Sequence, residues 1–537
     1  MKMQQSAKES AIINKIYGSI CSLSNKVDRI KDKKAEYIVL ALYLIGHIVI
    51  TYFHEPWYDE AEAWNIAKSG TLKEIIFDVP HLEGHPALWY IILKVFTVLG
   101  INYEAALNIC SLIFAGIAVY LLIFKSPFPR IVRILLPFTY FFFYQYGVIT
   151  RPYCVTMMAF VVAAVVYKLR STKPWLYTLS LALICATSAY GLVLSGGLAV
   201  AWVIELLKKN KIKALLKDKS TYCLLGLLIY ALFILYRIIP KDSSSISFAS
   251  ENFVNGLGVR LVYTFFVIVP DLFLTNIFNE YGHLHDMPFE FVSFSITAIV
   301  GVVILFGFIR YAIVKKTIIQ LSIPFILFSL FSGFVYLYNH HIGILLCFFI
   351  FWLWISFEIP SSYKVNNFKR YTTTIAIAGC LMVSLGWSMI SSVVEVIDNY
   401  GPAAEIAEYL EESKLEDATI LFSWNGDKYG VKYSPLEVAF LPYKTKEKIM
   451  NWPVENPLFP FYLASETIDL YEDILLRISN GPIPSVVVGE VDFSTLYEDR
   501  VNSTDYYCAK QVQHAIIWKG TQKNCTTKIY KYKDIKG

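Results

Sequence analysis

Residues 37–64 read "YIVLALYLIGHIVITYFHEPWYDEAEAW", and the two halves of this stretch have opposite character. The first half, residues 37–53, is apolar and long enough for a helix across a bilayer, which takes about 17 to 25 such residues. The second half places Asp59, Glu60 and Glu62 directly after that helix. Charge near a bilayer is energetically expensive, so we expect these acids to have a role.

The composition of the whole chain indicates a membrane protein. Of its 537 residues, 56% are hydrophobic and 17% are charged, and the mean hydropathy is +0.49. These values lie far from the average of soluble globular proteins. The net charge of +5 comes from Lys and Arg clusters between apolar runs. Such clusters report membrane orientation, and they do not indicate a nucleic-acid partner.

Repeated apolar runs predict an α-helical polytopic membrane protein with about 11 transmembrane helices. The expected spans are residues 37–53, 104–124, 131–149, 153–167, 174–190, 191–207, 221–239, 288–310, 317–337, 341–358 and 371–391. Two further apolar stretches are ambiguous. The stretch 85–100 is short for a span and includes Lys94, and the apolar run of residues 260–278 is interrupted by Pro270 and Asp271.

The basic residues orient these spans. If residues 85–100 crossed the membrane, the basic clusters from Lys125 onward would move outside, so the positive-inside rule favours an interfacial or re-entrant helix there. We expect neither ambiguous stretch to cross. The chain then divides into a cytoplasmic segment without a cleavable signal peptide (1–36), a transmembrane catalytic module (37–391) with external loops 54–103 and 240–287, and an extracytoplasmic domain (392–537).

The external domain has the composition of a small soluble α/β domain. "AAEIAEYLEESK" (403–414) has the apolar spacing of a helix, and "ATILF" (418–422) and "SVVVGEV" (485–491) are typical of strands. Cys508 and Cys525 both lie in this domain. An oxidising compartment would allow them to form a disulfide.

The chemically unusual residues collect on the expected external side. They come from the acidic stretch, from "EGHPALWY" (83–90), from "ITRPY" (149–153) and from "YNHH" (338–341). The candidate catalytic residues are Asp59 and Glu60, and the candidate substrate-binding residues are Glu62, Glu83, His85, Arg151, Tyr153, His340 and His341.

Each of these residues also has a plain structural interpretation. Acids in a first helical turn cap free amides and complement the helix dipole, and Asp59 stands at such a position. Arg151 at the start of a span suits the lipid headgroup layer, and His85 before Pro86 suits a fixed loop turn. Histidines that end a span, such as His340, suit the membrane interface.

An acidic pair directly after the first span, then "EGHPALWY", then an external "RPY" resembles the GT-C superfamily of integral membrane glycosyltransferases. The similarity is greatest to the protein O-mannosyltransferase and lipid A aminoarabinose transferase branch (glycosyltransferase family 39-like), whose elements read Asp-Glu and His-Pro-Pro-Leu-Tyr. It covers roughly residues 1–360. The resemblance implies that Asp59 is catalytic and that the donor is a sugar on a polyprenyl or dolichyl phosphate.

The residues fit that chemistry. We expect an acceptor hydroxyl to attack the anomeric carbon with inversion. This attack needs one general base, for which we select Asp59. The leaving lipid phosphate needs a cation, and the forked guanidinium of Arg151 suits it. The acceptor is a glycan, a lipid or a protein. The sequence shows no Gly-rich phosphate loop, and we expect no nucleotide cofactor.

We also expect no metal. Asp59-Glu60-Ala61 lacks the Asp-x-Asp spacing of the oligosaccharyltransferase branch, and "GHLHD" (282–286) offers only a weak ligand set. The alternative class is a lipid-linked glycan flippase or an O-antigen polymerase or ligase, which would place functional charges inside the bundle or in a late external loop. Either class is a multi-pass protein of the cell or plasma membrane. The sequence does not identify the sugar, the acceptor, the organism or the oligomeric state.

Overall fold

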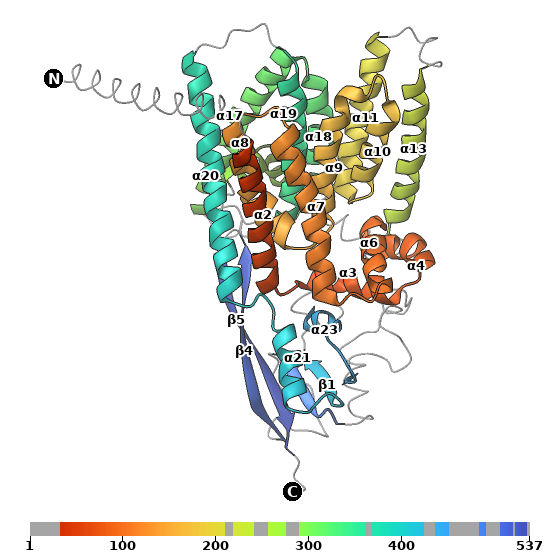
Figure 1. The fold of residues 1–537 in the computed structure, drawn as a ribbon, viewed down its shortest axis with the longest axis vertical. Coiled ribbons are helices and arrows are strands. Elements are labelled where there is room, and N and C mark those ends of the chain that lie inside the picture. The colour runs from red at the N-terminus through yellow and green to blue at the C-terminus, as the bar shows by residue number, and fades with distance from the viewer. Residues whose placement is uncertain are drawn as a thin grey trace, which may run out of the picture.

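A computed structural model describes the structured part of this chain, namely residues 33–209, 218–240, 256–274, 289–360, 367–423, 435–450, 483–489, 505–518 and 521–533. It shows a polytopic helical membrane protein in which a helical bundle carries a small sheet domain at one end (Figure 1). Every expected span corresponds to a helix in the bundle.

Within the described residues, nine helical segments are long and apolar enough to cross a bilayer. They are α2 (Lys34–Phe53), α7 (Tyr103–Lys125), the run α8 (Arg130–Leu135), η1 (Leu136–Phe138) and η2 (Phe141–Val148), α11 (Ala189–Lys209), α13 (Lys219–Ile238), the run α15 (Leu257–Val262), η4 (Tyr263–Val267) and α16 (Ile268–Leu274), α17 (Phe289–Lys315), α19 (Ile342–Glu358) and α20 (Asn367–Ile397). The expected spans α9 (Tyr153–Val166), α10 (Pro174–Cys185) and α18 (Ile318–Phe334) are shorter apolar helices of the same bundle.

Pro270 and Asp271, which interrupt the apolar run of residues 260–278, do not end the helix in the described part of that stretch. The helix continues from α15 through a π-helical turn into α16, which contains both residues. A wider π-turn just before a proline lets the backbone adjust where the proline removes a donor. Gly301 of α17 packs against the carbonyl of Phe266 in this turn, so closely that a β-carbon at residue 301 would collide with the oxygen. By length and composition this segment can span, and the expectation that it does not cross stays a prediction.

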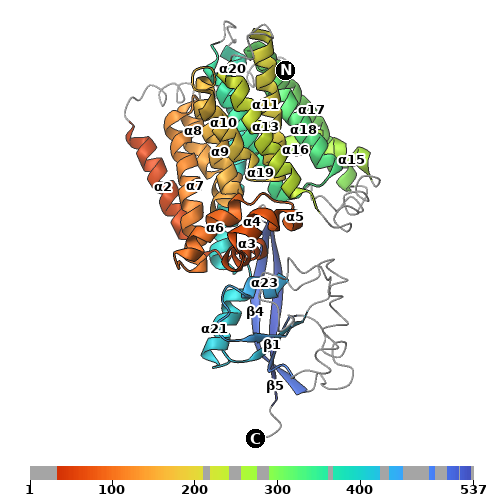
Figure 2. The same cartoon turned by 90° about the vertical axis from the view of Figure 1, so that its right-hand side faces the viewer.

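Four short helices follow α2 and lie between the bundle and the sheet domain (Figure 2). They are α3 (Tyr58–Ser69), α4 (Leu72–Phe77), α5 (Val79–Glu83) and α6 (Leu88–Val98). With 11 residues, α6 is about 16 Å long, roughly half the hydrocarbon thickness. This length agrees with the expectation that residues 85–100 do not cross the membrane.

The C-terminal domain combines helices with a mixed sheet, as the sequence predicts. Helices α21 (Ala403–Glu412) and α23 (Pro435–Phe440) accompany strands β1 (Thr419–Ser423), β2 (Lys448–Ile449), β3 (Val486–Gly489), β4 (Tyr506–Trp518) and β5 (Thr521–Tyr532). The strand order is β2-β1-β3-β5-β4, with β1 parallel to β2 and β3 and with β5 antiparallel to β3 and β4. Ile406, Leu410, Ile420, Val486 and Ile529 are buried in its core.

The register of the long β4–β5 hairpin does not bring the two external cysteines together. Cys508 pairs with Tyr530, and Cys525 pairs with His514. At about 3.3 Å per residue, this offset puts the two thiols far beyond disulfide distance. The pairing that an oxidising compartment would allow is therefore not formed in this structure.

The sheet domain is anchored to the loop helices that carry the acidic stretch. Helix α23 packs on α3, and the Asn65 side chain of α3 donates a hydrogen bond to the Val438 carbonyl of α23 (3.1 Å). The domain therefore lies over the same end of the bundle as α3 to α6 (Figure 2).

Candidate active site

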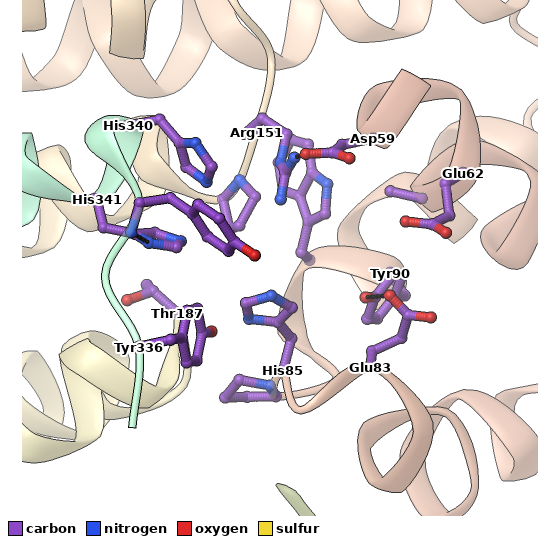
Figure 3. A pocket seen from close by; sticks show the side chains of 15 residues that line it. Asp59, Glu62, Glu83, His85, Tyr90, Arg151, Thr187, Tyr336, His340 and His341 are labelled. Carbon is purple, nitrogen blue, oxygen red and sulfur yellow. Dashed lines mark hydrogen bonds and ion pairs between the residues drawn. The ribbon is translucent and has the colours of Figure 1, made fainter. Parts of the chain in front are cut away.

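A pocket opens at the end of the bundle that faces the sheet domain. It is lined by Asp59, Glu62, Ala63, Glu83, His85, Pro86, Trp89, Tyr90, Arg151, Pro152, Thr187, Tyr336, Tyr338, His340 and His341. Four sequence-distant segments thus contribute the acids, the imidazoles and the arginine that the sequence singled out (Figure 3). Glu60 and Tyr153 are not among the lining residues.

Asp59 and Arg151 form an ion pair at the pocket. Asp59 is the second residue of α3, and Arg151 stands in the turn before α9, whose N-cap is Pro152. The guanidinium carbon lies 6.0 Å from the ring centre of Trp57 and 5.6 Å from that of Tyr153. Because only 11% of the Arg151 side chain is exposed, its charge acts in a medium that screens it less than water does.

Glu60, the neighbour of Asp59, points elsewhere. Its Oε2 accepts hydrogen bonds from the Trp57 backbone N–H (2.7 Å) and from His54 Nε2 (3.0 Å), and its Oε1 accepts from the Thr150 N–H (2.5 Å). The side chain is fully buried. Glu60 therefore caps α3, and Asp59, for which a capping role was the plain alternative, makes an ion pair into the pocket instead.

Two further carboxyl groups, those of Glu62 and Glu83, line the same pocket. Glu62 accepts a hydrogen bond from the Tyr58 hydroxyl (2.8 Å), and Glu83 lies 3.5 Å from the Tyr90 hydroxyl that donates to it. Burial and the nearby Glu62 carboxylate raise the pKa of Glu83 well above its usual value. A neutral carboxyl group can both donate and accept hydrogen bonds, which suits the hydroxyl groups of a ligand.

Gly84 sets the geometry of the "EGHP" turn. It ends α5 in the left-handed conformation, with φ of 65°, a backbone region that favours glycine. The turn lets Glu83, at the end of α5, and His85, just beyond it, both face the pocket (Figure 3).

Three histidines form the wall opposite the carboxyl groups (Figure 3). Burial lowers the pKa of His85 to about 4, so its imidazole is neutral at pH 7, and its Nδ1 has no hydrogen-bond partner among the described residues. The rings of His340 and His341 lie 4.1 Å apart, and His341 Nδ1 accepts from the Tyr338 N–H (3.2 Å). Imidazoles held this way can hydrogen-bond a ligand without adding positive charge.

Several residues of the site carry no signal in the sequence. Trp57 lies between Arg151 and His340, with its ring centre 5.7 Å from the His340 ring. Thr187 and Tyr336 line the pocket from bundle segments that contain no motif. Trp89 and Tyr90 stand within the quoted "HPALWY", where their apolar spacing is that of an ordinary buried helix.

The described residues contain no group of three or more His, Cys, Asp or Glu side chains that could hold a metal ion. The weak "GHLHD" ligand set, residues 282–286, lies outside the described residues.

Neither protein-family models nor curated protein sequences give a match to this chain. Among solved structures, the chain is similar to the single-particle cryo-EM structure of arabinofuranosyltransferase AftD from Mycobacteria. The TM-score is 0.38, the sequence identity is 13%, and the superposition covers 93% of this chain and 40% of that one. The present chain therefore spans less than half the length of that protein.

Proposed function

We propose that this protein is a membrane glycosyltransferase that moves a sugar from a polyprenyl-phosphate donor to an acceptor hydroxyl on the extracytoplasmic side, with inversion. The observation that carries the proposal is the Asp59–Arg151 ion pair in a pocket at the end of the bundle that faces the sheet domain. One carboxylate beside one guanidinium supplies the base and the phosphate-binding cation that the reaction needs.

In this mechanism Asp59 removes the proton of the acceptor hydroxyl as its oxygen attacks the anomeric carbon. The bond between that carbon and the phosphate oxygen breaks, and the lipid phosphate leaves with the bonding electrons. Arg151 compensates the negative charge that grows on the phosphate. General-base catalysis of this kind contributes about 10² to 10⁴ in rate.

The Asp59–Arg151 ion pair gives donor binding a second effect. The Arg151 guanidinium engages an oxygen of Asp59, and a cation held against a carboxylate makes it a weaker base. A donor phosphate competes with Asp59 for the guanidinium because its free oxygens match the forked donors. We therefore expect donor binding to free the base before the acceptor reacts.

The neutral polar groups of the pocket suit the sugar. Glu83 and His85 face the same space as the ion pair, and both favour their uncharged forms. We assign Glu62, Glu83, His85, His340 and His341 to sugar or acceptor contacts. Tyr153 supports the Arg151 guanidinium from outside the pocket, and we assign Glu60 to positioning because both its oxygens are occupied within the protein.

Mass spectrometry of surface glycans and glycoproteins tests this function. Cells that produce Asp59→Asn in place of the wild-type protein should lose a glycan or a glycan modification. Asp78→Asn is the matched control, because Asp78 joins α4 to α5 and is not among the pocket residues. Identical glycans in Asp59→Asn and wild-type cells would refute the proposal and favour the flippase or polymerase class.

A further inference from the structure

Three ionisable side chains lie buried behind the pocket. His54 Nδ1 is 2.7 Å from Glu395 Oε1, and His54 Nε2 is 3.0 Å from Glu60 Oε2. The three side chains are 2%, 0% and 0% exposed for His54, Glu60 and Glu395. The free-energy cost of removing such charged groups from water is about as large as the gain from their mutual attraction. A contribution to stability alone is therefore a poor explanation for this buried group.

The geometry of this group favours a doubly protonated imidazole. Both ring nitrogens face carboxylate oxygens, and an imidazole can donate from both only as the cation. Burial lowers the pKa of His54, but the charges of Glu60 and Glu395 outweigh burial and raise it well above the usual value. His54 thus favours its cationic form between two buried carboxyl groups.

Glu60 connects this group to both members of the catalytic pair. It accepts from the N–H of Trp57, the residue that caps α3, and from the N–H of Thr150. Asp59 stands two residues after the first of these contacts, and Arg151 stands one residue after the second. One side chain therefore sets the distance between the two backbone segments that present the ion pair.

Glu395 extends the connection to the last membrane helix. It lies near the end of α20, and its second oxygen accepts a hydrogen bond from the Tyr144 hydroxyl of η2. Just beyond α20, the Gly401 N–H donates to Glu55 (3.0 Å), and the Asn399 carbonyl accepts from the Ala515 N–H of β4 (2.7 Å). The end of α20 is thus tied both to the acidic stretch and to the sheet domain.

We propose that Glu395 is a positioning residue that holds Asp59 and Arg151 in their catalytic geometry through His54 and Glu60. The catalytic part of this inference rests on the function proposed above. It extends the site to a helix beyond residues 1–360, which carry the motif resemblance, because α20 begins at Asn367. A chain lacking residues 392–537 would keep every pocket residue and lose the support of the ion pair.

Glu395→Gln changes the charge of this group and keeps its shape. The imidazole then has one anionic partner in place of two, so burial favours its neutral form more strongly. A neutral imidazole donates from only one nitrogen, and the glutamine amide can donate to the other, so both hydrogen bonds can persist but Glu60 loses its cationic partner. We expect Glu60 to release the α3 and Thr150 segments and Arg151 to leave Asp59.

Arginine modification measures this release without any enzymatic assay. The full-length protein in lipid nanodiscs is treated with phenylglyoxal, and the rate at each arginine is read by peptide mass spectrometry. In Glu395→Gln, Arg151 should react about fivefold faster than in the wild type, a coupling typical of residues in one hydrogen-bonded network. Arg130, buried in its own ion pair with Glu36, is the internal standard and should not change.

Ser391→Ala is the matched control. Ser391 lies one turn before Glu395 on α20, is fully buried, and has no hydrogen-bond partner among the described residues. Equal Arg151 rates in Glu395→Gln and the wild type would overturn the proposal. If Arg130 also reacts faster, Glu395→Gln has disturbed the fold. The test then uses Tyr144→Phe in its place, which removes only the second hydrogen bond of Glu395. An unchanged Arg151 rate in Tyr144→Phe would then also overturn the proposal.

The pH dependence of sugar transfer supplies the second readout. Around the imidazole stand Glu60 from α3, Glu395 from α20, Glu55 next in the chain, and the ring of Tyr400 at 6.4 Å. With one carboxylate removed, the imidazole loses its proton at lower pH, so the alkaline limb of the profile should move to lower pH in Glu395→Gln and stay in Ser391→Ala. Faster Arg151 labelling in a protein whose wild type transfers no sugar would sustain the positioning role and refute the proposed function.

Discussion

Replacing Asp59 with asparagine should abolish transfer and leave the protein folded. Asparagine has nearly the shape of aspartate, keeps the first-turn position in α3, and lacks the ability to remove a proton. The capping contacts of α3 come from Glu60 and do not involve Asp59. The change therefore removes the base without disturbing the helix that presents it.

The two expected effects differ greatly in size. The side chain of Asp59 is 23% exposed, and ion pairs that keep contact with solvent contribute about 1 kcal/mol or less to stability. Loss of a general base lowers kcat by about 10² to 10⁴, which corresponds to about 2.7 to 5.4 kcal/mol of transition-state stabilisation. Activity should therefore fall far more than stability.

The assay uses purified protein in nanodiscs with lipid-linked sugars extracted from the host membrane. Release of polyprenyl phosphate gives turnover, and thermal unfolding of the same preparation gives stability. Asp78→Asn should match the wild type in both measurements. Turnover of Asp59→Asn within a few-fold of the wild type, with an unchanged unfolding midpoint, would show that Asp59 is not the base.

Arg151→Lys keeps the charge but loses the forked geometry, and it should raise the apparent KM for the donor. Arg151→Ala should raise it further, by the factor of about 10 to 100 that loss of a charged hydrogen bond produces. A defect confined to the acceptor would contradict the phosphate role. Glu60→Gln leaves a buried imidazolium with one partner fewer, so its thermal unfolding midpoint should fall clearly, by a loss of about 3 to 5 kcal/mol, and an unchanged midpoint would count against the buried network. The pKa of His85 is about 4 in the folded protein, against a usual 6.5, so the unfolded chain binds this proton at higher pH than the folded protein does. The stability present above pH 6.5 should therefore decline as the pH falls towards 4. In urea unfolding, His85→Asn should show a shallower decline. Single cysteines at Ser69 and Ser413 should both react with an impermeant reagent from the extracytoplasmic side, and protection of only one of them would show that the assumed number of crossings between them has the wrong parity.

The sequence by itself determined the class of this protein and the places of its helices. A bilayer offers no partner to backbone amides, so each crossing must be a continuous apolar helix, and such a helix is visible as a run of residues. The short apolar stretch of α6 was ambiguous by its apolar character, and the positive-inside rule set it apart from the spans. The π-turn before Pro270 was not visible in the sequence, because this change in the backbone depends on how closely α17 approaches it.

The candidate residues were also visible in the sequence, since acids, imidazoles and an arginine between spans are unusual wherever they occur. The different roles of these residues were not visible in the sequence. Asp59 and Glu60 are neighbours in the sequence, and successive residues of a helix point about 100° apart. Only the surroundings of α3 decide that Asp59 faces the pocket and Glu60 faces His54.

The partners that hold the site in place were decided by the tertiary structure alone. Glu395 meets His54 across 341 positions of sequence, and it stands in a helix whose other residues give no hint of chemistry. Local patterns report what a residue does for its own helix or turn, because those interactions join neighbours in the chain. A buried hydrogen bond between distant segments depends on how the helices pack, and that packing is a property of the whole folded bundle.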